Sequence, residues 1–292
     1  MRALFLCIAL FILSALPALA MDVLILQSSH SPAYMEALRG FRTAFTGSSN
    51  TIVIADYADV DAVRLVKEER PRLVLAVGDS ALAACRTVRQ VPVVSLMSLN
   101  LTLSKTTNPN IGGVGVVAAP ERYLNLFKAI NARRVGVLYD PRRSAGYLKR
   151  AQDAAQRLGI DLVAREVRNP KESVSRLEQL KGRVDALWMI PDTTAVTLEN
   201  LDAYFRFAME QQLPLVTFAR QYLDKGAIAA IEADRVDQGS VAVEQIRQLL
   251  GRKGEPLVVD PRKLHLSTND IVARKLGISI SGLERIVPGT GE

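Results

Sequence analysis

The sequence has very few of the residues that form metal centres, disulfides and nucleophilic sites. In 292 residues it contains two cysteines, Cys7 and Cys85, and two histidines, His30 and His265. Two histidines cannot supply a multi-histidine metal site, so we expect no metal and no cofactor. Cys85 lies in an alanine-rich stretch, far along the sequence from both histidines. We therefore expect Cys85 to be a small buried residue and not a nucleophile.

Aromatic residues are also scarce, and the basic residues do not gather in one place. Phe, Trp and Tyr make up 5% of the chain, whose formal net charge is +7. The adjacent basic pairs, at residues 133–134, 142–143, 252–253 and 262–263, are far apart and are not interleaved with aromatics. The stacking surface of a single-strand nucleic-acid binder is therefore missing. We expect a solvated basic surface and no nucleic-acid partner.

Long apolar runs are missing from the chain except at its N-terminus. That run covers residues 3–15 and leads to the small-x-small sequence of residues 18–20. It is too short to span a hydrocarbon core of about 30 Å comfortably. We expect residues 1–20 to be a secretory signal peptide. A large residue precedes Cys7, which argues against a lipid anchor there, so we predict no membrane insertion after cleavage.

A strand, a tight turn, a helix and a second strand are predicted over residues 71–96. Leu73 to Val77 are all apolar, which is typical of a strand buried on both faces of a parallel sheet. Gly78 permits a sharp turn, and Asp79 and Ser80 follow where a helix begins. Ligands of open parallel sheets bind beyond the carboxyl ends of the strands. Asp79 and Ser80 are therefore either helix caps or ligand-binding residues.

The same pattern returns later, where a second apolar strand leads to an aspartate and a hydroxyl residue. The spacing from Ser31 to Asp79 is 48 residues, and the spacing from Ser144 to Asp192 is also 48 residues. This equality predicts two similar α/β lobes in tandem, with Ser31 and Ser144 at equivalent positions. The alternative is a chance likeness between two α/β units.

Hydrophobic periodicity predicts strands and helices in alternation along the chain. We expect strands over residues 23–26, 51–55, 73–77, 93–96, 110–118, 135–139, 160–167, 186–190, 215–218 and 227–231, with short extended pieces at 257–260 and 263–266. We expect further helices over residues 32–45, 59–69, 120–130, 144–158, 171–180, 196–211, 237–250 and 269–276. This alternation implies mostly parallel sheets with right-handed crossovers. The predicted fold class is α/β, with two similar doubly wound lobes joined by a multi-strand hinge.

The order of several motifs resembles that of ABC-transporter substrate-binding proteins with the type I periplasmic binding fold. The motifs are VLAVGDSALAA (74–84), VPVVSL (91–96), RRVGVLYDP (133–141), VDALWMIPDTTAV (184–196), LPLVTF (213–218), and the longer stretches 225–256 and 264–280. More narrowly, the chain resembles a family of predicted amino-acid binders with tryptophan- and tyrosine-binding members. That family commonly has Gly-Thr where this chain has Gly78-Asp79-Ser80, which adds a carboxylate to the expected pocket.

The resemblance implies a periplasmic receptor that captures a small solute between its lobes and delivers it to the membrane permease of an ABC importer. The expected solute is an amino acid or a similar small organic molecule, and the expected protein is a monomer. We expect residues 21–117 plus 233–260 to form the first lobe, and 118–232 plus 261–292 to form the second. One alternative is a periplasmic ligand-sensing module of a signalling system. An α/β enzyme is less favoured, because the G-x-S-x-G and G-x-x-x-x-G-K-[ST] motifs are both missing.

Polar and aromatic residues at the predicted strand ends are the candidate ligand contacts. Helix N-termini and hydroxyl groups suit a carboxylate, aspartates suit an ammonium, and aromatic rings can flank an apolar side chain. The candidates are Ser28, Ser29, Tyr34, Asp79 and Ser80 in the first lobe, and Tyr139, Asp140, Ser144, Asp192, Thr193 and Phe218 in the second. Each serine, threonine or aspartate among them has an ordinary helix cap as its alternative role. We expect no catalytic residue.

Overall fold

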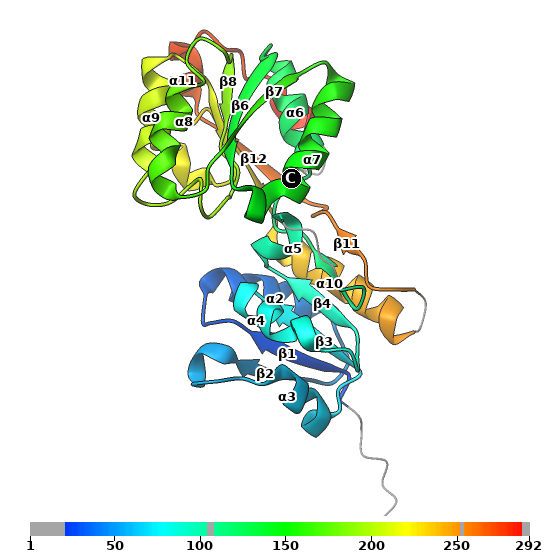
Figure 1. Cartoon of the computed structure of the whole chain (residues 1–292). Helices are drawn as coiled ribbons and strands as arrows, with labels where there is room; N and C mark the ends of the chain where they lie inside the picture. Colours follow the sequence, from blue (N-terminus) through cyan, green and yellow to red (C-terminus); the bar gives the residue numbers. More distant parts are fainter. Residues whose placement is uncertain (1–20, 104–107, 252–253, 288–292) are drawn as a thin grey trace, which may run out of the picture.

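The computed structural model describes residues 21–103, 108–251 and 254–287 (Figure 1). The predicted signal peptide, residues 1–20, lies outside the described residues. Two lobes, each built on its own sheet, follow one another along the molecule (Figure 1). The predicted fold class, two similar α/β lobes with mostly parallel sheets, is therefore confirmed.

The first lobe is built on a six-stranded sheet whose strands are all parallel. Its strand order is β11 (Val258–Val259), β5 (Ile111–Val114), β4 (Val93–Leu96), β3 (Leu73–Val77), β1 (Val23–Gln27) and β2 (Ser49–Val53). Every residue of β1 and β3 is buried. Helices cover both faces of these strands, which explains their nearly continuous apolar sequences.

The second lobe repeats this arrangement with one difference. Its strand order is β12 (Leu264–Thr268), β10 (Ala229–Ala233), β9 (Leu215–Thr217), β8 (Ala186–Trp188), β6 (Arg134–Tyr139) and β7 (Asp161–Glu166). Read in chain order, the first five strands of each lobe take the same places in their sheets. The sixth strand is parallel to its neighbour in the first lobe and antiparallel in the second. The two lobes are thus similar in topology, as the repeated sequence pattern predicts.

Helices form a layer on each face of both sheets. In the first lobe, α2 (Pro32–Ala44) and α10 (Arg235–Leu250) cover one face, and α3 (Ala62–Glu69) and α4 (Asp79–Ala84) cover the other. In the second lobe, α6 (Pro120–Ala129), α7 (Pro141–Leu158) and α11 (Asp270–Lys275) cover one face, and α8 (Ser173–Glu178) and α9 (Leu201–Glu210) cover the other. The short helix α5 (Leu99–Leu103) follows β4 and packs against α7 of the second lobe.

Three predicted helix starts are wrong by three residues or more. Helix α3 begins at Ala62 and not at residue 59, because the Asp61 side chain accepts a hydrogen bond from the Arg64 N–H and caps the helix there. Helix α7 begins at Pro141 and not at Ser144, because the Asp140 side chain accepts a hydrogen bond from the Arg142 N–H and caps the helix there. Helix α9 begins at Leu201, and a turn closed by a 2.8 Å bond from the Thr197 N–H to the Asn200 side chain precedes it. A side-chain cap decides where α3 and α7 start, whereas a turn before Leu201 delays the start of α9.

The predicted equivalence of Ser31 and Ser144 is also wrong. Ser31 is the residue before α2, whereas Ser144 lies inside the first turn of α7. The residue that matches Ser31 at the start of its helix is Asp140. The equal spacing of 48 residues is therefore a coincidence of sequence, although the two lobes do share their strand order.

The chain passes between the two sheets three times. It leaves the first sheet after β5, returns after β10 through α10, and leaves again between β11 and β12. The predicted strand at 110–118 is therefore shorter than expected, because β5 ends at Val114 and the following residues cross to the second lobe. Strand β10 extends two residues beyond its predicted end, to Ala233, and leads directly into the second crossing.

Two tyrosines of the second lobe hold the first and second crossings. The Tyr147 hydroxyl donates to the carbonyl of Ala118 (2.8 Å), and the Tyr123 hydroxyl donates to the carbonyl of Ile231 (3.0 Å). Both rings pack against buried Trp188, with centroid distances of 5.0 Å for Tyr123 and 5.9 Å for Tyr147. An aromatic cluster in the core of the second lobe therefore fixes the points at which two crossings enter it.

The first lobe holds the other end of the first crossing. The buried side chain of Gln238, on α10, donates to the carbonyl of Gly115 at 2.7 Å. Val116 and Val117 thus lie between one point fixed by the first lobe and one fixed by the second. The third crossing is held by charge, since Arg262 binds both Asp237 (2.8 Å) and Glu244 (3.0 Å) of α10.

Helices α2 and α10 approach each other closely where two glycines meet the opposite backbone. A Cβ atom added to Gly239 would lie 2.0 Å from the carbonyl oxygen of Ala37, and one added to Gly40 would lie 1.9 Å from that of Val236. Any side chain at these two positions would hold the helices apart. The close contact brings Phe41 and Ile246 together in the same buried cluster.

Candidate functional site

A cavity of about 260 Å³ lies between the lobes, beside the first two crossings. Residues of the first lobe, the second lobe and both crossings line it: Ala33, Met97, Leu99, Val116, Val117, Pro191, Phe218, Ala219, Ile231, Glu232, Ala233, Arg235 and Gln238. Most of this lining is apolar, and only Glu232, Arg235 and Gln238 carry charged or polar side chains. An apolar cleft with a few polar groups between two lobes is the usual form of a small-molecule site.

The polar side chains of this cavity differ in what they already bind. Arg235 is paired with Glu36 of α2 at 2.9 Å. The Gln238 amide nitrogen is bound to the carbonyl of Gly115. The Glu232 side chain has no hydrogen bond or ion pair to another described residue. Glu232 is thus the charged group of the cavity that is free to bind a ligand.

A second, charged cavity of about 280 Å³ adjoins the apolar one. It shares Glu232, Ala233 and Arg235 with the apolar cavity, and its other lining residues are Glu36, Arg39, Asp234, Val236 and His265. Burial raises the pKa of Asp234, but the Asp237 N–H and the side chains of Lys263 and His265 outweigh it and lower the pKa to about 2. Asp234 is therefore ionised and already engaged at neutral pH.

Asp79, predicted as a ligand contact, holds the loop that supplies two lining residues of the apolar cavity. Its carboxylate accepts hydrogen bonds from the Ser98 hydroxyl and from the Asn100 N–H (2.9 Å) at the start of α5. Met97, immediately before, has a φ of +58°, a left-handed conformation that is costly for a residue with a side chain. Asp79 thus stabilises the loop that directs Met97 and Leu99 toward the cavity.

Ser28 and Tyr34, both predicted as ligand contacts, come together over Gly78. The Ser28 hydroxyl accepts a 2.9 Å bond from the Ala81 N–H, in the first turn of α4. A Cβ atom at Gly78, whose φ is +89°, would lie 2.5 Å from the Tyr34 hydroxyl and 2.6 Å from that of Ser28. Burial, and then the charge of Asp79, raise the pKa of Tyr34. These groups close the turn after β3.

Three predicted residues of the second lobe form a buried network. Asp192 accepts from the Ser144 hydroxyl (2.6 Å), from the Asp140 N–H (2.8 Å) and from the N–H groups of Thr194 and Ala195 (both 2.9 Å). Asp140 accepts from Thr194 (2.8 Å) and pairs with Arg142 (2.8 Å). The Arg142 guanidinium lowers the pKa of Asp140 to about 2. Asp140, Ser144 and Asp192 are fully buried, so their polar atoms are used within the lobe.

The remaining predicted residues are spread over both lobes. Ser80 and Thr193 are exposed, and neither side chain has a hydrogen-bond partner among the described residues. The Ser29 carbonyl accepts from the Gln27 side chain (2.7 Å), and the Tyr139 hydroxyl lies 3.4 Å from Glu166. Burial raises the pKa of Tyr139. Of all the predicted residues, Phe218 is the one that lines the cavity between the lobes. Ligand contact stays a prediction for every one of them.

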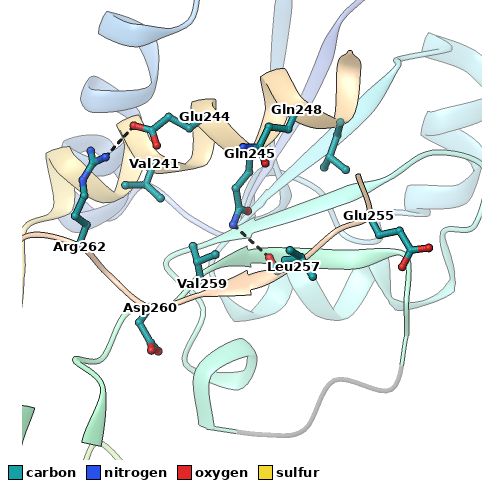
Figure 2. A pocket seen from close by; sticks show the side chains of 10 residues that line it. Val241, Glu244, Gln245, Gln248, Glu255, Leu257, Val259, Asp260 and Arg262 are labelled. Atoms are coloured by element: carbon teal, nitrogen blue, oxygen red, sulfur yellow. Dashed lines mark hydrogen bonds and ion pairs between the residues drawn. The ribbon is translucent and has the colours of Figure 1, made fainter. Parts of the chain in front are cut away.

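Another groove, of about 280 Å³, lies on the first lobe between α10 and β11 (Figure 2). Figure 2 shows Gln245 of α10 reaching the carbonyl of Leu257 (3.3 Å), and Glu244 paired with Arg262. Glu255, at its rim, is exposed and has no partner among the described residues. The groove belongs to one lobe and an edge strand, so closure of the lobes would not enclose it.

The lining of the apolar cavity was not predicted, apart from Phe218. Two of its parts, Val116–Val117 and Ile231–Ala233, belong to the crossings. The predicted lobe boundaries, at 117/118 and 232/233, fall at these residues and are the one sequence feature that points to this part of the lining. Met97 and Leu99 follow β4, a strand end that carries no conspicuous polar group. Within the described residues, no cluster of His, Cys, Asp or Glu is placed to hold a metal ion.

One protein-family model matches this chain. The family model described as ABC transporter substrate binding protein matches residues 53–287. The chain therefore belongs to the ABC transporter substrate binding protein family, as the sequence resemblance predicts. A search among curated proteins found no match.

Solved structures share the two-lobe fold at low sequence identity. A conserved domain protein from Vibrio cholerae is 17% identical, with a TM-score of 0.62, over 92% of this chain and 99% of that one. An ABC domain in complex with L-Trp from Streptococcus pneumonia is 18% identical, with a TM-score of 0.60, over 90% and 96%. A ligand-free, open substrate binding protein with adhesive properties from Clostridium difficile is 17% identical, with a TM-score of 0.64, over 90% and 96%. These likenesses show a shared fold.

The family and these two binding-protein neighbours support a solute-binding role for the chain. No helix among the described residues combines the length and apolarity needed to span a bilayer.

Proposed function

We propose that the chain is the periplasmic receptor of an ABC importer. It captures a small solute in the apolar cavity between its lobes and delivers it to a membrane permease. The observation that carries this proposal is the cavity itself, because both lobes and two crossings contribute to its lining. A solute bound there would contact both lobes at once and so favour their closure.

The proposed solute is an amino acid or a similar small organic molecule. The mostly apolar lining suits an apolar body, and the neighbouring charged cavity suits a polar head group. The L-Trp bound to the Streptococcus protein supports an amino acid, although that protein shares only 18% identity with this chain. The signal peptide of residues 1–20 and the periplasmic location belong to the same proposal.

The lobe boundaries belong to the proposal as well. We assign residues 21–117 plus 233–260 to one lobe and residues 118–232 plus 261–292 to the other. The three passages between the sheets support this division. The proposal also includes that the protein is a monomer.

A thermal-shift screen tests the receptor function. Purified protein without residues 1–20 is heated with a panel of amino acids, amines, organic acids and sugars. A solute that binds only the folded state increases the free energy of unfolding by RT ln(1 + [L]/Kd) and so raises the melting temperature. Small-angle X-ray scattering with the best solute then measures closure as a decrease in the radius of gyration. A panel that leaves the melting temperature unchanged throughout contradicts the proposal.

Two variants link binding to the cavity between the lobes. Ala219→Trp places a large ring in that cavity and should abolish the thermal shift. Ala145→Trp, on the exposed side of α7, is the matched control and should leave the shift intact. Ser80→Ala and Thr193→Ala test the two predicted strand-end corners, and each should weaken binding by about 1–2 kcal/mol if the solute reaches them.

Uptake of the identified solute by cells that lack the protein separates import from signalling. Lost uptake supports delivery to a permease. Normal uptake with a lost transcriptional response supports the alternative, a ligand-sensing module with the same fold.

A further inference from the structure

Glu232 lies where the second crossing leaves the second lobe, next to the last residue of β10. It lines both the apolar cavity and the charged cavity beside it. Its carboxylate lies near enough to the buried Tyr123 for its charge, after burial itself, to raise the pKa of that phenol. Glu232 therefore combines a partly buried position with access to a cavity.

Two basic side chains near Glu232, those of His265 and Arg235, already have another partner. His265 lies directly opposite Glu232 in the β10–β12 ladder, but its Nε2 atom is 3.1 Å from Asp234. Arg235, three residues further along the chain, is held by Glu36 at 2.9 Å. No described residue forms a hydrogen bond or ion pair with the Glu232 side chain. The Glu232 carboxylate thus lies between two basic side chains that are bound to other carboxylates, and it can accept from a further donor.

The lining of the apolar cavity has an unpaired carboxylate, that of Glu232, but no unpaired basic side chain. Arg235 is the one basic residue of its lining, and Glu36 neutralises it. Arg39, which has no ion pair to another described residue, lines the charged cavity instead. A ligand in the apolar cavity thus finds a carboxylate within reach, and finds an unpaired guanidinium only if it extends into the neighbouring cavity.

We propose that Glu232 recognises a cationic nitrogen on an otherwise apolar ligand. The ligand body contacts Leu99, Val116 and Phe218, and the ammonium group pairs with the Glu232 carboxylate. This assignment rests on the proposed receptor function and names the chemistry that its cavity selects. An apolar amine and an apolar amino acid share that chemistry, and they differ in whether a carboxylate extends toward Arg39.

The test uses two matched sets of probes that differ in one group at a time. L-leucine, isoamylamine and isocaproate share one apolar body, and L-phenylalanine, phenethylamine and hydrocinnamate share another. The amine lacks the carboxylate of the amino acid, and the acid lacks its ammonium. Thermal shift and isothermal titration are measured for each probe with the wild-type protein, Glu232→Gln and Glu255→Gln.

We expect at least one ammonium-bearing probe to stabilise the wild type, and the acid of the same body to have no effect. Glu232→Gln should weaken that probe by roughly ten- to a hundredfold, the range for losing a charge-assisted hydrogen bond. Glu255→Gln is the matched control, because it removes an exposed, unpaired carboxylate from the groove in Figure 2 and should bind as the wild type does. Without ligand, Glu232→Gln should melt like the wild type, since Glu232 has no partner to lose.

An amine and an amino acid both carry the cationic nitrogen, and they are distinguished by the carboxylate of the amino acid. Equal binding of amine and amino acid shows that Glu232 alone selects the ligand. Binding of the amino acid only, weakened by both Glu232→Gln and Arg39→Gln, shows that the ligand extends into the charged cavity.

Three results overturn the assignment: binding of the acids as tight as that of the amines, unchanged affinity in Glu232→Gln, or no response to any ammonium-bearing probe. If another solute from the wider screen binds and lacks a cationic nitrogen, the receptor function stands and the role of Glu232 falls.

Discussion

The glycine contact between α2 and α10 allows a test in which two physical effects predict opposite signs. Gly239→Ala adds a methyl group to a helix interior, which by helix propensity alone stabilises by about 1 kcal/mol. The new Cβ atom would lie 2.0 Å from the Ala37 carbonyl oxygen and 2.6 Å from the Phe41 nitrogen. Both are backbone atoms, so they cannot rotate away as a side chain could.

The steric effect should win. An ordinary contact needs about 1 Å more, so the helices must move apart, and overpacking of this kind costs roughly 1–3 kcal/mol. Separation also loosens the buried contacts that Phe41 and Ile246 make in the same cluster. Because both contacts are with backbone atoms, we take the upper end of that cost, about 3 kcal/mol. After the propensity gain of about 1 kcal/mol is subtracted, Gly239→Ala should lower the free energy of unfolding by about 2 kcal/mol.

The assay is urea unfolding followed by far-ultraviolet circular dichroism, with the midpoint and slope fitted separately. Ser240→Ala, one residue along the same helix, is the matched control and should change the free energy by less than about 0.5 kcal/mol. Gly40→Ala should behave like Gly239→Ala, and the double variant should cost less than the sum because one separation relieves both clashes. A Gly239→Ala protein more stable than the wild type would refute the close contact.

Three further predictions concern single side chains. Cys85 is fully buried and burial raises its pKa to about 12, so thiol reagents should not label the native protein, and Cys85→Ala should cost about 1 kcal/mol of stability in urea unfolding. Asp140 has a folded pKa of about 2 against an ordinary 3.8, so its contribution is present above about pH 4 and is lost as the pH falls through 2; Asp140→Asn should cost about 1 kcal/mol at pH 7 and clearly less at pH 2, measured as unfolding free energy against pH. Asp79→Asn should cost about 1 kcal/mol by weakening the cap of α5, whereas Ser80→Ala, with no partner to lose, should leave stability unchanged.

Strands were the most predictable elements. Leu73–Val77 forms β3 with the predicted bounds, because a strand between two layers of helices must be apolar at every position. The short final pieces, β11 and β12, were also expected, although nothing in their sequences indicates that one is parallel and the other antiparallel. That direction depends on which lobe each piece joins after the last crossing.

Helix starts were less predictable where a cap competes with periodicity. The pair Asp140-Pro141 is a typical cap and first residue, and giving it more weight than Ser144 would have placed the start of α7 correctly. Starting α7 at Ser144 also makes Ser144 look equivalent to Ser31, which does precede its helix. The sequence therefore contains the cap that sets the start of α7, Asp140, but the 48-residue spacing from Ser144 to Asp192 points to a different residue.

The candidate site could be predicted only in part, because a polar side chain at a strand end can either contact a ligand or cap a neighbouring helix. Asp140, Ser144 and Asp192 satisfy one another inside the second lobe, which sequence alone cannot distinguish from a set of groups open to a cleft. The cavity lining is mostly apolar and is assembled from residues far apart in the chain, such as Met97 and Ile231. Its position follows from where the crossings bend, which depends on packing between the lobes.

The fixed points of the first crossing have a kinetic consequence. Gln238 holds the carbonyl of Gly115 and Tyr147 holds that of Ala118, so Val116 and Val117 lie between two fixed points, and the Thr102 hydroxyl accepts from the Val116 N–H at 3.0 Å. Both valines also line the cavity, so a solute bound there, as we propose, would rest against the segment that joins the lobes. Residence time and equilibrium selectivity would then depend on the same two side chains. A chain adapting to a new solute at these positions would change its release rate in the same step.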